Sequence, residues 1–380
     1  MLTYQIPYAL RTGLLILSAS FLLLKVLIFD SFRYRDIILI IIALALTFFI
    51  AYKIKNIRFF TDSIVIVSCI GIDFKKIIKT YFIVSISFMV AITISSQVGI
   101  VTDLVYSNST RGLRHSLGLL YPTVYSARIF FLGLAYLYLR AGKLKIYEVV
   151  SLLGIAYLLI VFTDGRLDSY LLIASILVFY LYPKLNIHFV KFISLIGCVA
   201  PLIGAALSYF SASIYDSMNP FHVTLNRLFS TRLSLGNLAL SLYQSKPFGQ
   251  VIFEQGNGGL AGYNNLVNQY FFIDSSYLSI LLKNGWIFFA GLLFLMVYRL
   301  AILYKEKKYY LILAWSLVCI NSMVATFLFS LEVNVFIIFL FSNLKNEKIF
   351  VNQSRNGKEQ IMQSSILKLK STKLSKDVDI

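Results

Sequence analysis

Three cationic or titratable side chains gather in one short stretch of a chain that otherwise avoids charge. The stretch 111–123 reads RGLRHSLGLLYPT and holds Arg111, Arg114 and His115 within five positions. Long apolar runs lie on both sides of it. Arginine forks bind phosphate groups in a bidentate manner. The arginines of this stretch therefore indicate an anion-binding site at the edge of an apolar region.

Three further arginines, Arg166, Arg227 and Arg232, lie in other polar segments with few acids nearby. An arginine at the end of a membrane span often has no ligand and only extends its guanidinium group toward the lipid head groups. That alternative applies to each residue taken singly. The set as a whole, spread over separate segments on one predicted side, favours a pocket for a lipid diphosphate or another polyanion.

Asp274 is the acid whose position stands out. The stretch 271–291, FFIDSSYLSILLKNGWIFFAG, places it at the start of an apolar run, beside Ser275, Ser276 and Tyr277. A half-buried carboxylate there has a raised pKa and can take a proton from a hydroxyl group. Asp before an apolar run is also a common helix N-cap. The two roles are compatible, and the sequence leaves both open.

The sequence lacks the motifs of several other types of catalytic and binding site. The chain has no HExxH, GxSxG or Walker sequence and only three histidines. Its three cysteines, Cys69, Cys198 and Cys319, lie in apolar segments without CxxC spacing. We therefore expect no metal site, no disulfide and no cofactor.

The composition indicates what positions these residues. Of 380 residues, 58% are hydrophobic and 14% charged, whereas soluble domains have about 25% charged residues. Runs of roughly 18 apolar residues predict membrane spans, and the first such run is a span and not a cleaved signal. The sequence thus predicts an all-α polytopic integral membrane protein with about 10–12 transmembrane helices. The eleven expected spans are 12–29, 36–52, 57–72, 77–100, 122–140, 147–163, 168–183, 189–211, 276–298, 309–329 and 331–344.

Basic loops orient the chain. The net charge of +18 reflects Lys and Arg in cytoplasmic loops, not a nucleic-acid partner. The loops 140–145, 183–191 and 298–308 are the basic ones and are placed inside. If 57–72 is only interfacial, the count falls to ten and the N-terminus lies inside. Residues 1–344 form the membrane domain, and the tail 345–380, with eight Lys or Arg against four Asp or Glu, is expected to be cytoplasmic and disordered.

The segments 101–121, 163–169 and 212–275 are then outside. The last is too long for a connector and too polar to span. Residues 221–240 carry apolar side chains at helical spacing and predict an amphipathic helix near the membrane surface. QSKPFGQ (244–250) predicts a turn. The Gly- and Asn-rich stretch that follows suits sugar hydroxyl groups and equally suits an ordinary loop.

Three stretches resemble the Wzy-type polysaccharide polymerases of exopolysaccharide, capsule and O-antigen loci. RGLRHSLGLLYPT is similar to a family segment R-x-x-R-x-S-L-G-F-x-H-P-N, with Tyr121 and Thr123 departing from the His and Asn of that pattern. FTDGRLDSY (162–170) is similar to a second Arg-bearing segment. IDSSYLSILLKNGWIFF (273–289) resembles the element that follows the large loop, which in O-antigen ligases begins with His where this chain has Asp274.

The resemblance implies a metal-independent glycosyltransferase in the bacterial cytoplasmic membrane. It would polymerise oligosaccharide repeat units carried on undecaprenyl diphosphate, at the outer face. The arginines that would bind the diphosphates are Arg111, Arg114, Arg166, Arg227 and Arg232; the base would be Asp274 or His115. Implied partners are the lipid-linked oligosaccharide, the bilayer, a repeat-unit flippase and a chain-length regulator. The alternatives are an O-antigen or wall-polymer ligase, against which Asp274 argues, and a transporter of lipid-linked sugars or anions, against which the lack of internal repeats argues.

Overall fold

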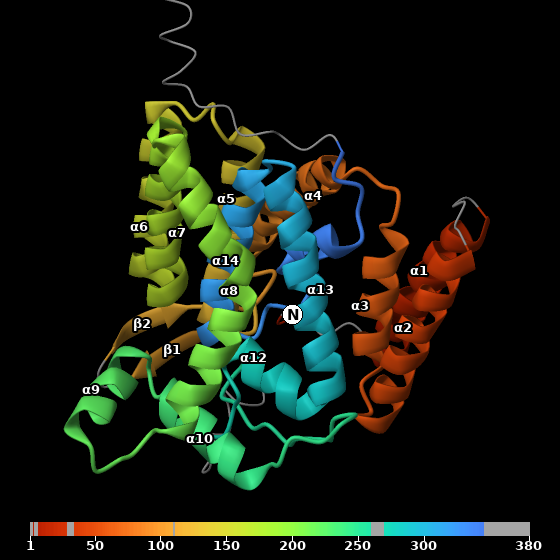
Figure 1. Ribbon diagram of the computed structural model, residues 1–380. Helices are drawn as coiled ribbons and strands as arrows, with labels where there is room; N and C mark the ends of the chain where they lie inside the picture. Colours follow the sequence, from red (N-terminus) through yellow and green to blue (C-terminus); the bar gives the residue numbers. More distant parts are fainter. Residues whose placement is uncertain (1–2, 4–6, 29–33, 109–110, 260–269, 346–380) are drawn as a thin grey trace, which may run out of the picture.

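The computed structural model describes residues 3, 7–28, 34–108, 111–259 and 270–345. This part of the chain is mostly helical, and its helices lie side by side in a bundle (Figure 1). Among the described residues, five helices are long and apolar enough to cross a membrane: α4 (Phe74–Gln97), α6 (Ile146–Thr163), α7 (Arg166–Leu181, continued by a 3-10 turn to Lys184), α8 (Ile187–Ser213) and α13 (Trp286–Lys305). These are the features of an all-α membrane protein, as predicted; the count of eleven spans stays a prediction.

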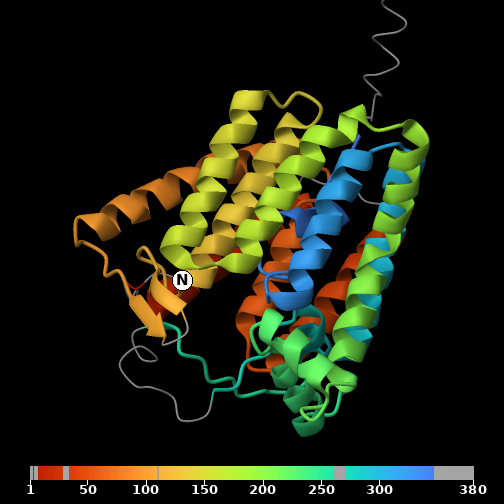
Figure 2. The ribbon, with the colours of Figure 1, turned by 90° about the vertical axis from the view of Figure 1, so that its left-hand side faces the viewer.

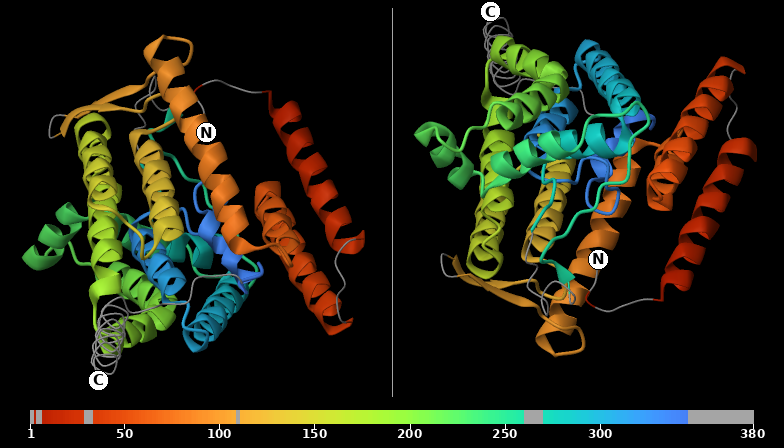
Figure 3. Two further views of the ribbon diagram at one scale, coloured as in Figure 1. Left: turned by 90° about the horizontal axis from the view of Figure 1, so that it is seen from above. Right: turned by 90° about the horizontal axis from the view of Figure 1, so that it is seen from below.

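Two helices form the centre of the bundle, α5 (Pro122–Arg140) and α14 (Tyr309–Val324). Phe130, Phe131 and Trp315 on them are completely buried. Both helices carry apolar side chains on all their faces, as expected of helices that are enclosed by other helices. The apolar helices α1 (Tyr8–Ile28) and α2 (Tyr34–Lys53) lie at the rim instead, and Figure 3 shows them beside α3 (Ile57–Ser68), apart from the rest.

The predicted helical span 331–344 is wrong. Residues after α14 run irregularly, with one 3-10 helix, η3 (Val335–Leu340), in which every residue is buried. Neighbouring helices satisfy this backbone: Tyr81 donates to the carbonyl of Val333 (2.7 Å), and Arg299 donates to the carbonyl of Ser342 (2.9 Å). Irregular backbone inside a membrane protein is stable only where protein surrounds it, and nothing in the apolar run 335–341 indicates this irregular conformation.

The predicted span 276–298 is broken into three pieces. α12 (Ser276–Ser279) passes into a π-helical turn (Ile280–Asn284), and α13 begins only after Gly285. The carbonyls of Lys246 and Pro247 cap α13, accepting from the backbone N–H of Trp286 (3.1 Å) and Ile287 (3.2 Å). Gly285 has φ +93°, and a Cβ there would overlap the carbonyl oxygen of Pro247. The crossing helix is therefore 286–305.

The elements divide between two ends of the bundle. The basic connections between α5 and α6, α7 and α8, and α13 and α14 lie at one, which we call the basic end (Figures 1 and 2). The other, the hairpin end, carries an antiparallel hairpin of β1 (Val105–Asn108) and β2 (Arg111–His115), together with α9 (Pro220–Leu228), α10 (Arg232–Leu242) and α12. The hairpin was not predicted. Segments predicted to share a side of the membrane thus share an end of the molecule.

The N-terminal region also lies at the hairpin end. The Thr3 hydroxyl donates to the carbonyls of Thr102 (3.1 Å) and Gly118 (3.2 Å). The alternative with ten spans puts the N-terminus at the basic end, so this contact favours a crossing near 57–72. The helix there, α3, has 12 residues.

The long segment 212–275 is structured over its described residues, up to 259 and from 270. The amphipathic helix predicted over 221–240 is two helices, α9 and α10, separated by a turn at Phe229–Thr231. The turn predicted in 244–250 is confirmed at Pro247 and Phe248. Most of the Gly- and Asn-rich stretch and the tail beyond Lys345 lie outside the described residues.

Candidate functional site

A strained turn presents Arg232 at the start of α10. Ser230 and Thr231, just before it, both have left-handed backbone, with φ of 52° and 68°. That region favours glycine, and other residues held there cost about 1–3 kcal/mol each. Two consecutive residues of this kind persist only where the surroundings fix them.

Asn226 of α9 fixes this turn. It is buried, and its side-chain oxygen accepts from the backbone N–H of Leu233 and Ser234, each at 3.1 Å. Its own carbonyl accepts from the N–H of Thr231 at 2.8 Å. Asn226 therefore serves as the helix cap that the left-handed Thr231 does not provide, and it holds Arg232 in place. In the sequence alone, Asn226 is only a polar residue of the predicted amphipathic helix.

Asp274 lies beside Arg232. Its Oδ2 is 3.5 Å from Arg232 Nε, an ion pair without hydrogen-bond geometry. Burial raises the pKa of Asp274, Arg232 lowers it by less, and Glu254 raises it further. The N-cap of α12 is Ser275, whose side chain accepts from the N–H of Leu278. The alternative that Asp274 caps the helix is therefore wrong, and its carboxylate is available for another role.

Asp168 lies deeper, in the first turn of α7. It is 5% exposed and accepts from the hydroxyl of Ser126 (2.7 Å) on α5 and the amide of Asn321 (2.9 Å) on α14. Arg232 acts on it electrostatically. Arg232 thus pairs with Asp274 and acts on Asp168 only electrostatically. The sequence places Asp168 among the outer acids but gives it no role, because an acid in a first helical turn is ordinary.

Arg114 enters the same region from β2. It is 7% exposed, and its Nε donates to the carbonyl of Thr163 at 3.1 Å, at the C-terminal end of α6. Its guanidinium carbon lies 5.5 Å from the centre of the Tyr121 ring. Its Nη2 has no hydrogen-bond partner among the described residues. This buried donor is aligned by a strand, a helix end and an aromatic ring.

Tyr270 lies within the electrostatic influence of the Arg232–Asp274 pair. Burial and the charges of Asp274 and Tyr121 raise the pKa of its hydroxyl, and Arg232 lowers it. Tyr270 is thus in electrostatic range of Asp274, Arg232 and the Tyr121 ring against which Arg114 packs. We call these five residues the Arg232 cluster: Arg114, Asp168, Arg232, Tyr270 and Asp274.

Other predicted arginines are not part of this cluster. Arg166 is 54% exposed and pairs with Asp164 (2.7 Å), two residues earlier. Arg227 is exposed on α9, with no ion pair among the described residues. Arg111 begins β2, and its side chain lies outside what the structure describes. The cluster therefore contains two of the five predicted arginines.

His115 follows Arg114 in β2 and points to the other face of the strand. Its Nδ1 lies 2.6 Å from Oδ2 of Asp103, and the other oxygen of Asp103 accepts from the N–H of Leu117 at 2.7 Å. Its ring centre is 6.5 Å from that of Phe162. His115 pairs with Asp103, and no hydrogen bond or ion pair among the described residues joins it to the Arg232 cluster. Of the two predicted bases, only Asp274 is paired with Arg232.

A second group of charges, the Glu332 cluster, consists of Glu332 and Arg128, which are mostly buried, and Arg58, which is 43% exposed. Glu332 Oε2 is 2.8 Å from Arg58 Nη2 and 3.5 Å from Arg128 Nη2. Arg128 Nη1 also donates to the carbonyl of Glu332 at 3.1 Å. The cluster joins α3, α5 and the irregular segment after α14. It was not predicted from the sequence.

Among the described residues, no three His, Cys, Asp or Glu side chains gather in a way that could hold a metal ion. The three cysteines are free and buried. Metal independence of any reaction stays a prediction.

No family model, curated protein or solved structure matches this chain. The resemblance to Wzy-type polymerases rests on the three sequence segments quoted above.

The Arg232 cluster combines two arginines for an anion with a carboxylate whose proton affinity is raised. Arg114 and Arg232 are both largely buried, where a charge-assisted hydrogen bond to an anion is stronger than in water. Asp274 stands 23% exposed beside Arg232, accessible to a ligand. The arrangement can hold a phosphate-bearing molecule and take a proton from a hydroxyl group brought next to it.

Proposed function

We propose that this chain polymerises oligosaccharide repeat units carried on a polyprenyl diphosphate, at the outer face of the bacterial cytoplasmic membrane. The observation that supports this best is the juxtaposition of Arg232 and Asp274, at 3.5 Å, at the end of the bundle opposite the basic loops. An anion-binding group and a proton acceptor are the two functions that transfer from a lipid diphosphate to a hydroxyl group requires.

Each residue has a role in this reaction. Arg114 and Arg232 bind the diphosphate of the donor and stabilise the charge that grows on it as it leaves. Asp274 takes the proton of the acceptor hydroxyl as its oxygen bonds to the anomeric carbon and the bond from that carbon to the phosphate oxygen breaks. Asn226 fixes the turn that presents Arg232, and Asp168 adds a negative charge that acts on Arg232. The diphosphate leaves as an anion, so no acid has to protonate it.

The partners follow from the substrate. The units are assembled on the cytoplasmic side, so a flippase must deliver them, and a chain-length regulator is the expected second partner. An O-antigen or wall-polymer ligase would use the same donor but transfer it once, to a different acceptor. A transporter would move the lipid-linked sugar and form no glycosidic bond.

The test uses the purified full chain in proteoliposomes with lipid-linked repeat units as the only sugar. Proposed activity gives a ladder of oligomers on the lipid carrier, with and without EDTA. A single transfer product with an added acceptor and no ladder indicates a ligase, and transbilayer movement without a new bond indicates a transporter. Arg232→Gln in the same vesicles is the matched negative control. A ladder that requires an added divalent cation contradicts the arginine-based mechanism.

A further inference from the structure

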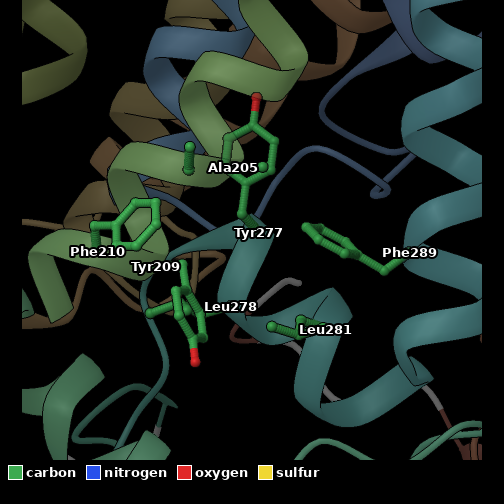
Figure 4. Close-up of a pocket in the computed structure, with 8 residues that line it drawn as sticks. Ala205, Tyr209, Phe210, Tyr277, Leu278, Leu281 and Phe289 are labelled. Atoms are coloured by element: carbon green, nitrogen blue, oxygen red, sulfur yellow. The ribbon is translucent and has the colours of Figure 1, made fainter. Parts of the chain in front are cut away.

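An apolar cavity of about 230 Å³ lies between α8 and the α12–α13 region. Its walls are aromatic and aliphatic: Ala205, Ala206, Tyr209, Phe210, Tyr277, Leu278, Leu281 and Phe289. Figure 4 shows Phe289 reaching from α13 toward Tyr277, with Leu278 and Leu281 along the lower side. Leu281 belongs to the π-helical turn, a feature that often marks functional sites.

The cavity opens where the protein meets lipid. Ala206, Tyr209 and Phe210 are exposed on α8, one of the helices long and apolar enough to span a membrane. Ala205, Tyr277 and Leu278 behind them are buried. A hydrocarbon chain can therefore enter sideways from the bilayer without crossing a polar surface.

One lining residue, Leu278, also contacts α10, the helix that carries Arg232. Gly236 packs on Leu278, since a Cβ on Gly236 would lie 3.1 Å from Leu278 Cδ1. Arg232 is four residues before Gly236 on the same face of α10, about 6 Å along the helix axis. Tyr277 also follows Asp274 by only three residues. A molecule with its phosphate at Arg232 would thus have its next atoms at the cavity wall.

We propose that this cavity binds the phosphate-proximal isoprene units of the polyprenyl carrier. The inference rests on the proposed function and adds where the lipid lies. An engineered cavity of about 150 Å³ already binds benzene, so this one has room for a short piece of chain. A helix, about 10 Å across, does not fit.

The lining favours a prenyl chain over a phospholipid. A prenyl phosphate is hydrocarbon from the first carbon beyond its phosphate oxygen. A phospholipid carries glycerol and two ester carbonyls at that point, and these groups lose hydrogen bonds when they enter apolar surroundings. The lining offers only the tyrosine hydroxyls as polar side-chain groups. The cavity lining therefore favours a ligand whose hydrocarbon chain begins directly at the phosphate oxygen.

The test is binding without turnover, so that its result does not depend on polymerase activity. The full chain in nanodiscs is incubated with undecaprenyl monophosphate that carries a diazirine on its first isoprene unit, irradiated and digested. We expect labelling of peptides that contain 205–210 and 277–289. Unlabelled undecaprenyl monophosphate should compete, and phosphatidylglycerol at the same mole fraction should not.

Ala206→Phe fills the mouth of the cavity from an exposed position, so the core does not have to move. Labelling should fall about tenfold or more, the effect of losing the burial of two methylene groups. Ile203→Phe, on the exposed surface of α8 outside the lining, is the matched control and should label like the parent. Ala206→Leu fills less and should give an intermediate value.

Labelling at other helices, or equal competition by phosphatidylglycerol, overturns the inference. Either result leaves the polymerase proposal to its own test, because ladder formation is scored separately.

Discussion

The Arg232 cluster and the Glu332 cluster both pair arginine with a carboxylate, and the two carboxylates are buried to nearly the same extent. The side chain of Asp274 is 23% exposed and that of Glu332 is 22% exposed. Each cluster also leaves one guanidinium Nε without a hydrogen-bond partner among the described residues, on Arg232 and on Arg128. Neither burial nor an orphan donor distinguishes them.

Pairing and backbone do distinguish them. Glu332 has two arginines, at 2.8 and 3.5 Å, on helices of ordinary geometry. Asp274 has one, at 3.5 Å, and that arginine follows two strained residues, Ser230 and Thr231. A carboxylate paired with two arginines connects the helices that carry them and has a structural role. A carboxylate with a single arginine, fixed in position next to a strained turn, is instead typical of a binding site.

Asp274→Asn should give the largest effect on the reaction. Asn keeps the size and accepts hydrogen bonds but cannot take a proton, and Ser275 already caps α12, so folding is unaffected. We expect normal protein abundance and a rate of polymer formation lower by about 10²–10⁴. Single repeat units should accumulate on the lipid carrier, as measured by mass spectrometry of extracted lipids.

His115→Ala is the matched test of the second predicted base. Its partner Asp103 would keep the backbone contact to Leu117. Polymer formation should stay near the level of the parent. If Asp274→Asn polymerises normally and His115→Ala does not, the catalytic assignment moves to the other face of β2.

Arg232→Lys should reduce the rate by about 10²-fold, the size found when one preorganised donor is lost. A lysine supplies a point charge but not the fork that spans two phosphate oxygens. The matched control is Arg166→Lys, because Arg166 is exposed and its one ion pair among the described residues is with Asp164. The two are compared by ladder formation in proteoliposomes at equal protein. An equally large loss in Arg166→Lys would show that exposed arginines contribute as much as the clamped one.

Glu332→Ala should act on the protein and not on the chemistry. It leaves Arg128 without a carboxylate and Arg58 with only the more distant Asp62 (3.9 Å), and it releases the irregular segment whose carbonyl at Ala325 accepts from Ser276 of α12. Removing one partner of a buried charge set is strongly destabilising, so membrane-embedded protein should fall several-fold. The protein that remains should retain most of its activity per molecule. Normal abundance with lost activity would make Glu332 part of the site.

The sequence predicts the parts of the site that depend on residue type and on membrane side. Arg114, Arg232 and Asp274 stand out because charge is rare around them, and basic loops assign them to one end. The Glu332 cluster is different, since Arg128 and Glu332 are 204 residues apart and each looks like an isolated charge in an apolar segment. Only the folded arrangement, in which η3 packs against α3 and α4 and α4 packs against α5, brings them together.

The sequence also did not predict several features of the local backbone conformation. The periodicity of 221–240 continues through the turn that divides α9 from α10, so apolar spacing alone gives one helix. Asn226 resembles any polar loop residue until its contacts with Leu233 and Ser234 are seen. The apolar run that contains Gly285 likewise gives no sign that 246–250 packs across it.

Glu254→Gln should give the smallest effect and the most specific one. Glu254 raises the pKa of Asp274, and its partner Lys283 lies 2.6 Å away. Gln at 254 still accepts from the N–H of Ile273, as Glu254 does at 3.0 Å, so the loop keeps its anchor. The substitution removes a negative charge and leaves Lys283 uncompensated, and both changes favour the ionised form of Asp274. The pKa of Asp274 therefore falls.

A base must be ionised to act, so the rate rises with pH through the pKa of Asp274 and is constant above it. In Glu254→Gln the rising part of the pH–rate curve, its acid limb, should move to lower pH, while the maximal rate at high pH stays the same. The measurement is the initial rate of ladder formation against pH. Glu306→Gln, the same change beside Lys308 at the basic end, is the control and should leave the limb in place. A shift to higher pH, or a lower plateau with no shift, would mean that the titrating group is not Asp274. The two clusters would then be alike in holding structural carboxylates only.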